Sequence, residues 1–262
     1  MIVTNTFAPI DTLRPLETGH PLLRGAIYYE HPSLPLDVIS KITYASSGGV
    51  VSAMGPAPGT LAYTFDGSTG RQQMRALGTF PKYSPFTLSV WCRGTSNAVP
   101  YQTAWANSVD SGNRGNLVLL WHHADRALGV LIYINGGFII GDGPNKFDGR
   151  WHHLAVTGSS GALNLYFDAK VIASVGGSFD SGNVLNAFGT YDSAWPMLGS
   201  VHGRAAWSRA LSATEVAQLY AEGRTGYPTL LRRARGVVYF LPQATVKGRR
   251  TLYHRVGSRG VA

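Results

Sequence analysis

Short apolar segments with a two-residue period recur along this chain, and they constrain its fold more than any other feature. In residues 86–92, the side chains of Phe86, Leu88, Val90 and Cys92 would share one face of an extended strand. Similar segments bounded by turn residues are expected to form strands at 26–30, 61–65, 117–121, 128–134, 151–156, 163–167, 171–175 and 204–207. Many short strands at this spacing predict an all-β sandwich or barrel.

The composition agrees with this prediction. Only 14% of the residues are charged, and there are 32 glycines and 14 prolines. Long amphipathic helices need more Glu, Lys and Ala than this, whereas short strands joined by tight turns use Gly and Pro.

One short helix is nevertheless predicted near the end of the sandwich. Ser212 is suited to the N-cap, and Glu215 three residues later completes a capping box. Leu211 and Val216 occupy the two positions of a hydrophobic staple, and Gly223 is placed where a left-handed C-terminal cap is common. These features predict a helix over residues 212–222.

Four segments resemble laminin G-like (concanavalin A-like) domains in the family's order and spacing. They are 86–91, 148–157, 163–173 and 208–216, and the resemblance covers roughly residues 60–222. It implies a two-sheet antiparallel jelly-roll sandwich with one short C-terminal helix and extended terminal arms. Two departures stand out: Ala169 replaces the usual hairpin glycine, which costs about 1 kcal/mol or selects another turn, and His202-Gly203-Arg204 replaces an Asp-Glu pair, which makes a site using that pair doubtful.

The net charge is confined to one end of the chain. Of 23 basic residues, nine lie in 223–262, which has no acidic residue, so residues 1–222 carry 23 − 9 = 14 basic and 14 acidic residues. We therefore predict three parts: a proline-rich extended arm over 1–40, the jelly-roll domain over 41–222, and a basic arm with a hairpin over 223–262.

The basic arm is predicted to dock on a partner. Its predicted hairpin contains an apolar strand, and a two-stranded ribbon is rarely stable alone in water, so docking on another protein is favoured. Nucleic acid is the alternative partner, because the arginines of the arm can contact phosphates. The expected docking residues are Arg232, Arg233, Arg235, Val237, Val238, Phe240, Leu241, Arg249 and Arg250.

We expect no enzymatic activity. Glycosidases place two carboxylates across the scissile bond, but the four glutamates, Glu17, Glu30, Glu215 and Glu222, do not form a strand motif of that kind. A nucleophile elbow, a phosphate-binding loop and a His-Glu metal motif are also absent from the sequence.

A few loop and strand residues are candidates for binding a metal ion. Neighbouring histidines such as His152 and His153 point to opposite faces of a strand, so they are interpreted as core or surface histidines. Two Asp-Ser-Gly-Asn segments are either ordinary turns or calcium sites, with Asp110, Asn113, Asp180 and Asn183 as the candidate ligands.

The six tryptophans are divided by their context. Trp91, Trp151 and Trp207 lie in strands and are predicted to be core residues. The loop aromatics are either anchors or a sugar-stacking platform, and the candidate carbohydrate-binding residues are Trp105, Trp195, Tyr191 and Asp192.

The expected biological setting follows from what the chain lacks. Its start has neither a basic nor an apolar leader, no segment is long enough to span a membrane, and the single cysteine excludes an internal disulfide. We expect a homo-oligomeric virion protein, made in the host cytoplasm and anchored to other virion subunits by its arms, as in laminin G-like proteins of tailed phages that decorate a capsid or tail. The alternative is a carbohydrate-binding module of a cellular protein, whose tail binds an acidic polymer or nucleic acid.

Overall fold

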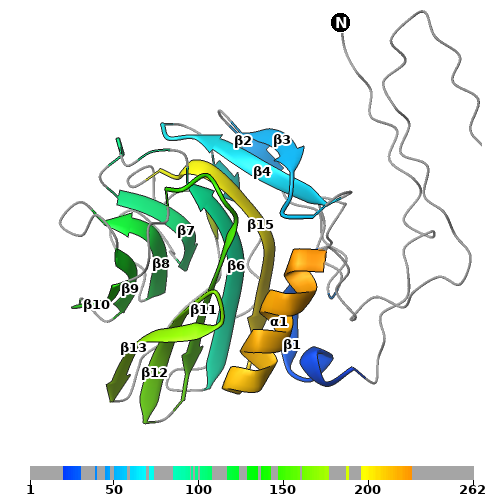
Figure 1. Cartoon of the computed structure of the whole chain (residues 1–262), viewed down its shortest axis with the longest axis vertical. Helices are drawn as coiled ribbons and strands as arrows, with labels where there is room; N and C mark the ends of the chain where they lie inside the picture. Colours follow the sequence, from blue (N-terminus) through cyan, green and yellow to red (C-terminus); the bar gives the residue numbers. More distant parts are fainter. Residues whose placement is uncertain are drawn as a thin grey trace, which may run out of the picture.

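Two antiparallel β-sheets packed face to face form the body of the protein, and one helix lies outside them (Figure 1). The computed structural model describes residues 20–30, 39, 45–47, 50–57, 60–68, 71–73, 85–94, 96, 98–99, 101–107, 117–123, 129–134, 137–142, 147–159, 161–176, 187–188 and 196–225. The predicted all-β jelly-roll sandwich with a short C-terminal helix is confirmed. None of the helices within these ranges is long and apolar enough to cross a membrane.

The first sheet has eight strands in the order β13-β12-β11-β6-β15-β4-β3, with β1 also paired to β15. Its strands are β1 (Ala26–Tyr29), β3 (Val51–Met54), β4 (Leu61–Asp66), β6 (Phe86–Gly94), β11 (His152–Gly158), β12 (Ala162–Phe167), β13 (Lys170–Gly176) and β15 (Leu198–Trp207). The second sheet has seven strands in the order β10-β9-β8-β7-β14-β5-β2. Its strands are β2 (Ala45–Ser47), β5 (Arg71–Gln73), β7 (Tyr101–Asn107), β8 (Leu117–His123), β9 (Gly129–Ile134), β10 (Gly137–Asp142) and β14 (Ala187–Phe188).

Strand β6 lies at the centre of the first sheet, between β11 and β15. The alternation predicted for it is confirmed, because Phe86, Leu88, Val90 and Cys92 are all buried in the core between the sheets. Burying a large apolar side chain contributes about 1.5–3 kcal/mol, so this face is held together by apolar packing. The intervening residues, including Trp91, point to the outer face of the sheet, where a second cluster lies under the helix.

Strand β15 bends in its middle and so has two different neighbours. Its first half, from Leu198 to Val201, pairs with β4, whereas Ala205 to Trp207 pair with β1. Between them the register with β6 shifts, and Gly203 has a φ of 59°. A β-bulge with a left-handed glycine bends a strand in this way.

The N-terminal region is partly a component of the sandwich, which corrects the prediction of an arm extending to residue 40. Strand β1 is the strand expected near residues 26–30, and it pairs with β15 instead of extending away from the domain. The next residue, Glu30, is buried and forms an ion pair with the buried side chain of Arg204. Burial alone would raise the pKa of Glu30, but the Arg204 guanidinium holds that pKa below its ordinary value.

Helix α1 (Ala213–Thr225) begins as the sequence predicts. The Ser212 backbone N–H donates to Oε2 of Glu215 at 2.9 Å, and the Glu215 backbone N–H donates to Oγ of Ser212 at 3.3 Å. Leu211 and Val216 are buried in one cluster on the outer face of the first sheet. Both the capping box and the hydrophobic staple are therefore confirmed.

The end of the helix differs from the prediction, because Gly223 is not its C-terminal cap. The helix continues through Gly223 to Thr225, so the expected boundary between domain and arm falls inside a helix. A Cβ atom on Gly223 would lie 2.3 Å from Nε1 of Trp91. The glycine therefore allows the helix to approach the sheet closely.

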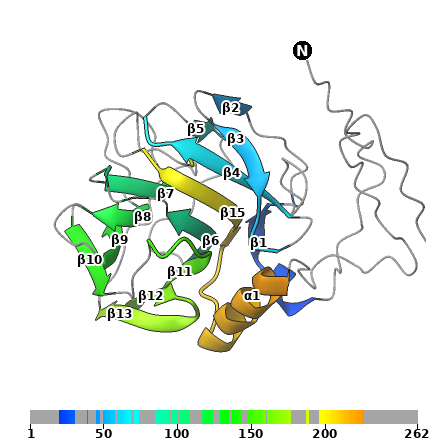
Figure 2. The ribbon, with the colours of Figure 1, turned by 45° about the horizontal axis from the view of Figure 1, so that its top comes forward.

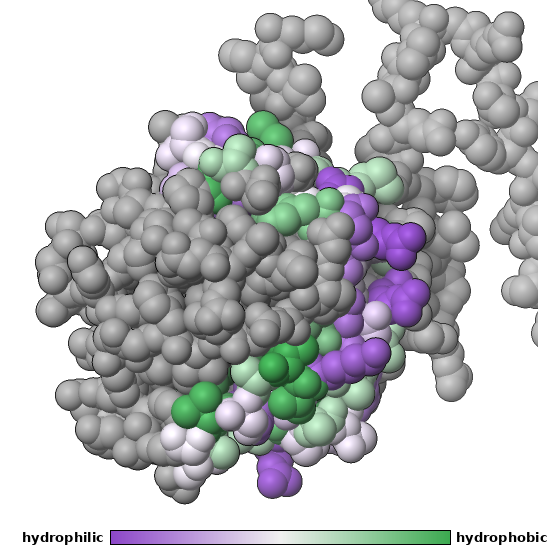
Figure 3. All heavy atoms as spheres, turned by 60° about the vertical axis from the view of Figure 1, so that its left-hand side comes forward, coloured by the Kyte–Doolittle hydropathy of each residue, from purple (hydrophilic) through white to green (hydrophobic). Residues whose placement is uncertain are grey.

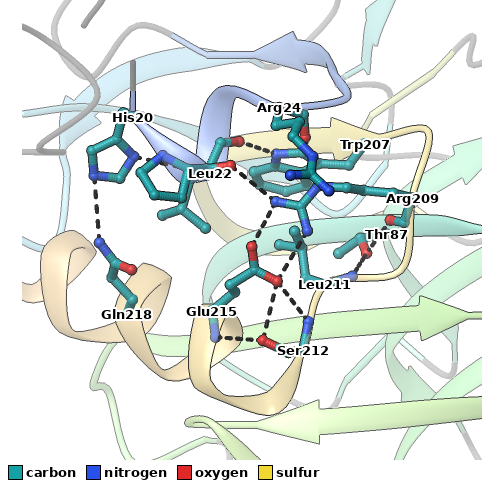
Figure 4. Close-up of polar contacts among 11 residues, drawn as sticks. His20, Leu22, Arg24, Thr87, Trp207, Arg209, Leu211, Ser212, Glu215 and Gln218 are labelled. Atoms are coloured by element: carbon teal, nitrogen blue, oxygen red, sulfur yellow. Dashed lines mark hydrogen bonds and ion pairs between the residues drawn. The ribbon is translucent and has the colours of Figure 1, made fainter. Parts of the chain in front are cut away.

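A network of polar contacts fastens helix α1 to the N-terminal segment (Figure 4), which lies beside the helix in Figure 2. Arg209 donates to both carboxylate oxygens of Glu215 and to the backbone oxygens of Pro21 and Arg24. Hydrogen bonds from Arg209 lower the pKa of Glu215 to about 2. The short 3-10 helix η2 (Pro21–Leu23) is thereby held beside α1.

Candidate functional site

A groove of about 540 Å³ lies on the outer side of the first sheet, beside the end of helix α1. Five separate segments of the chain contribute to it: the loop after β3, strand β6, the start of β11, the β12–β13 turn, and the helix. Its lining residues are Pro56, Trp91, Arg150, Trp151, His152, Asp168, Tyr220 and Arg224. We call this feature the α1 groove. Its volume is in the range of known small-molecule sites.

Aromatic rings build the walls of the α1 groove. The rings of Trp91 and Tyr220 are stacked, with their centroids 5.5 Å apart and their planes 10° from parallel. Trp151 meets the His202 ring edge to face at 6.4 Å. His202 is itself fixed, because its Nδ1 donates to the backbone oxygen of Leu61 at 2.5 Å. These contacts limit the movement of the rings. Trp91 is only 4% exposed, so Trp151 and Tyr220 are the partly exposed rings of the groove.

Two arginine side chains lie over these rings. The Arg93 guanidinium carbon is 5.1 Å from the centre of the Trp151 ring, and that of Arg224 is 5.7 Å from the centre of the Tyr220 ring. A third arginine, Arg150, lies at the start of β11, and its side chain is 82% exposed. An arginine over an aromatic ring is favourable by about 0.5–1 kcal/mol at an exposed site.

The two carboxylates next to the groove are held by a histidine. His152 Nδ1 donates to Oδ2 of Asp168 at 2.8 Å, and its Nε2 donates to Oδ1 of Asp148 at 3.1 Å. Both ring nitrogens can donate only when the imidazole is protonated. Burial by itself would lower the pKa of His152, but hydrogen bonds to Asp168 and Asp148 raise that pKa above its ordinary value.

Further hydrogen bonds restrain the same carboxylates. Asp148 accepts from the Arg150 backbone N–H at 2.8 Å. Burial alone would raise the pKa of Asp148, but this hydrogen bond and the contact with His152 together lower that pKa. Asp168 accepts from the His153 backbone N–H at 2.8 Å. The two carboxylates therefore act as structural acceptors.

The β12–β13 turn that carries Asp168 has an unusual backbone. Asp168 and Ala169 have φ values of 48° and 64°, the left-handed conformation that favours glycine. Of the two outcomes expected for Ala169, the structure shows the strained one, because the turn keeps a positive φ at that residue. The contacts of Asp168 with His152 and His153 hold the turn in place.

The histidines of the first sheet are structural, as the sequence predicts. His153 is buried on the outer face, where its Nε2 shares a 2.7 Å hydrogen bond with Oγ of Ser89. Burial lowers the pKa of His153 to about 4, and burial also lowers the pKa of His202. Within the described ranges, no group of three or more His, Cys, Asp or Glu residues could hold a metal ion.

The aromatic predictions are reversed at two positions. Trp105, a candidate for sugar stacking, lies in β7 with 0% exposure, and its ring meets that of Tyr28 at 5.9 Å in the core. It cannot meet a ligand, because the two sheets enclose it. Trp151, predicted to be a core residue, is only partly buried and lines the α1 groove.

Most other predicted site residues lie outside the described ranges. These are the sugar candidates Tyr191, Asp192 and Trp195, the calcium candidates Asp110, Asn113, Asp180 and Asn183, and all nine docking residues between 232 and 250. They stay predictions.

Sequence reasoning missed the residues that form the groove. Arg93 and Arg150 were not singled out, and Tyr220 and Arg224 were seen only as parts of the helix and of the basic arm. The spacing of Tyr220 and Arg224, four residues apart on one helix face, was the available sign that they belong together.

Large apolar side chains are also exposed, but they do not form one surface. Val51 and Met54 lie on β3, and Val171 and Val175 lie on β13, which are the opposite edges of the first sheet. On the face drawn in Figure 3, hydrophobic and hydrophilic residues lie next to one another. The α1 groove, which is open to solvent and has a volume of about 540 Å³, is therefore taken as the candidate site.

Two packed antiparallel sheets with an outer helix form the sandwich of a concanavalin A-like domain. The sequence profile of the Laminin_G_3 family, described as the concanavalin A-like lectin/glucanases superfamily, matches residues 66–217. The chain belongs to this family, which confirms the resemblance seen in the sequence.

Two curated relatives are similar to the chain. Pentraxin-4 of Homo sapiens is 28% identical over 264 residues, covering 92% of this chain and 49% of the relative. The sushi, von Willebrand factor type A, EGF and pentraxin domain-containing protein 1 of Rattus norvegicus is 31% identical over 96 residues, covering 36% of this chain and 2% of the relative. The chain thus spans half or less of the length of these relatives.

Solved structures share the fold at low sequence identity. Domain 4 of AbnA, an extracellular arabinanase of Geobacillus stearothermophilus solved in complex with arabinotriose, has a TM-score of 0.54 and 15% identity, covering 74% of this chain and 98% of that domain. The binding domain of botulinum neurotoxin serotype D has a TM-score of 0.56 and 13% identity, covering 75% and 51%. These similarities establish the fold alone.

Proposed function

We propose that this protein is a non-enzymatic binding module whose ligand is a carbohydrate. The observation that carries the proposal is the composition of the α1 groove, in which aromatic rings line the walls while the adjacent carboxylates are engaged by His152. Sugar rings pack their C–H groups against aromatic faces, and polar groups at the rim bind the hydroxyls. The groove is therefore suited to holding a saccharide and poorly suited to cleaving one.

The protonation states of the carboxyl groups support binding without hydrolysis. A glycosidase needs one carboxylic acid with a raised pKa and a second carboxylate across the scissile bond. The pKa values of Glu30, Glu215 and Asp148 are all lowered, because basic groups or backbone N–H groups bind their carboxylates. None of these three therefore shows the raised pKa that a general acid needs.

The structural relatives provide further support. Domain 4 of AbnA holds an arabinotriose, so a sandwich of this kind can carry an oligosaccharide in that protein. Other neighbours of similar fold are toxin binding domains, such as that of botulinum neurotoxin serotype D.

The proposal is tested by a binding screen combined with a hydrolysis assay. The purified protein is applied to an array of neutral and charged oligosaccharides, and bound compounds are then incubated with it while new reducing ends are measured. We expect binding to at least one class without any increase in reducing ends. Failure to bind every saccharide would refute the binding function, and sustained hydrolysis abolished by an Asp→Asn change would refute its non-enzymatic nature.

We also propose that the module belongs to a virion and is anchored through residues 223–262. The supporting observation is the separation of charge, because residues 1–222 are neutral overall and the following segment carries all of the net charge.

Truncation after Thr225 tests this anchor, because it keeps helix α1 complete and removes the predicted docking residues. The truncated protein should keep its melting temperature and fail to join the particle seen by electron microscopy, whereas normal incorporation would eliminate the anchor. Salt-sensitive DNA binding by the tail would instead favour the cellular alternative.

A further inference from the structure

Three guanidinium groups lie at the α1 groove: Arg150 and Arg224 line it, and Arg93 lies over the ring of its lining residue Trp151. Neither Arg93 nor Arg224 has a carboxylate partner in the described part of the chain, although both lie over aromatic rings. Arg150 is only loosely paired, since its Nε lies 3.9 Å from Oδ2 of Asp148. This differs from Arg204 and Arg209, whose guanidinium groups are bonded to glutamates within the fold.

The aromatic rings restrain the unpaired arginines. A free arginine side chain loses rotamer freedom when a ligand fixes it, and this loss opposes binding. Arg93 over Trp151 and Arg224 over Tyr220 have already lost part of this freedom. A guanidinium positioned in this way offers its planar row of N–H donors to an oxyanion at a smaller entropic cost.

The local acidic groups do not cancel this positive charge. Asp148 and Asp168 both hydrogen-bond to the His152 ring and accept backbone N–H groups as well. Their side chains are 29% and 25% exposed, whereas that of Arg150 is 82% exposed and Arg224 is also exposed. A ligand entering the groove therefore meets positive charge next to apolar rings.

We infer that the α1 groove binds an anionic saccharide, whose carboxylate or sulfate groups pair with Arg93, Arg150 and Arg224 while its sugar ring packs against the aromatic wall. This inference rests on the proposed function and names its ligand class. A neutral sugar would leave the guanidinium groups without a partner, and a simple inorganic anion would leave the rings uncovered. A saccharide that carries oxyanions uses both features.

Titration calorimetry on the full-length protein tests the inference with four probes. These are an oligouronate, a sulfated oligosaccharide of similar length, a neutral oligosaccharide, and a single-stranded DNA of matched charge. We expect at least one of the first two to bind at least about tenfold more tightly than the neutral probe, because hydrogen bonds to charged groups contribute about 1.5–3 kcal/mol each. The comparison of carboxylate with sulfate identifies the preferred group.

Groove variants separate this site from the basic C-terminal segment. Arg93→Gln with Arg224→Gln should weaken binding of the anionic saccharide at least about tenfold, and Arg150→Gln, which alters an exposed side chain, should weaken it in the same direction. Arg24→Gln is the matched control, since it removes the same charge from an exposed position outside the groove. Thermal melting of each variant checks that the fold is retained.

Each outcome distinguishes the inference from the proposed function. If anionic saccharides bind equally well to the groove variants and to the wild type, the groove is not their site. If only neutral saccharides bind, the anionic preference is wrong while the carbohydrate function stands. If no saccharide binds, both are wrong. If DNA binds as tightly as the saccharides and depends on the same arginines, the groove recognises oxyanions of nucleic acid, and the inference is overturned.

Discussion

Both faces of the first sheet carry a buried apolar cluster, but the outer face adds hydrogen bonds and ring stacking to its cluster. On the inner face, alternate residues of β6 such as Leu88 and Val90 join an apolar core. On the outer face, Thr87 bonds the segment before α1, Ser89 bonds His153, and Trp91 stacks on Tyr220. Apolar packing tolerates changes of neighbour as long as volume is kept, whereas hydrogen bonds and close contacts depend on particular partners. The outer face should therefore be the more specific of the two.

The largest expected effect concerns the ion pair at the bend of β15. Glu30→Ala leaves the buried Arg204 without its carboxylate, and removing one partner of a buried pair destabilises by about 3–5 kcal/mol. The free energy of unfolding in urea measures this effect. The double variant Glu30→Leu with Arg204→Met should recover most of the loss, because the uncompensated charge is gone. A loss in the double variant as large as in the single one would show that the charge is not the cause.

A smaller effect is expected where helix α1 approaches the outer face. Gly223→Ala places a methyl group against the Trp91 indole, and overpacking of this kind costs about 1–3 kcal/mol. Alanine is otherwise the better helix former, so an isolated helix would gain stability from this change. Gly161→Ala is the control, because a Cβ there has no atom within 4 Å. A Gly223→Ala protein with an unchanged or raised melting temperature would contradict the close contact.

The β12–β13 turn offers a stabilising change. Ala169→Gly should raise the free energy of unfolding by about 1 kcal/mol, because the residue has a φ of 64° and glycine adopts that conformation without strain. The opposite change, Gly149→Ala at a φ of 78°, meets no neighbouring atom and should destabilise through the backbone alone. Thermal denaturation of both variants tests whether backbone conformation explains the difference.

The smallest effect is a pH dependence that arises from His152. Its pKa is raised in the folded state, so its stabilising contribution is complete below the unfolded-state pKa and is lost as pH rises through the folded-state pKa. The melting temperature of the wild type should exceed that of His152→Gln more at pH 5.5 than at pH 8.5. His153 and His202, whose lowered pKa values have the opposite effect, are present in both proteins. A constant difference across this pH range would mean that His152 is not charged in the fold.

Features that depend on neighbouring residues in the sequence were predicted better than features that depend on contacts between distant residues. The alternation in β6 and the capping box at Ser212 are local patterns, and both were predicted correctly. The role of Gly223 was misread because its reason is a ring on a strand about 130 residues earlier in the printed sequence. A glycine near the end of a predicted helix is compatible either with a C-terminal cap or with a close contact to another element.

The candidate site was harder to predict than the fold. The groove combines five segments of the chain that only the tertiary structure brings together. Trp151, which lines it, was predicted to be a core residue, whereas the buried Trp105 was predicted as a candidate for sugar binding. Trp105 lies in a strand whose sequence, Tyr101 to Asn107, has few large apolar residues, so the strand was not recognised. Trp151 directly precedes β11, so its side chain is less buried than the side chains of that strand.

The pairing of β1 with β15 also has a consequence for the order in which the protein is assembled during translation. Glu30 and Arg204 are 174 positions apart, so β1 leaves the ribosome long before its partner strand has been made. Closing such a long loop has an entropic cost that local hairpins do not have. The nascent chain should therefore carry β1 as an unpaired segment until synthesis has passed β15, and this sheet should be completed late, when β1 joins β15.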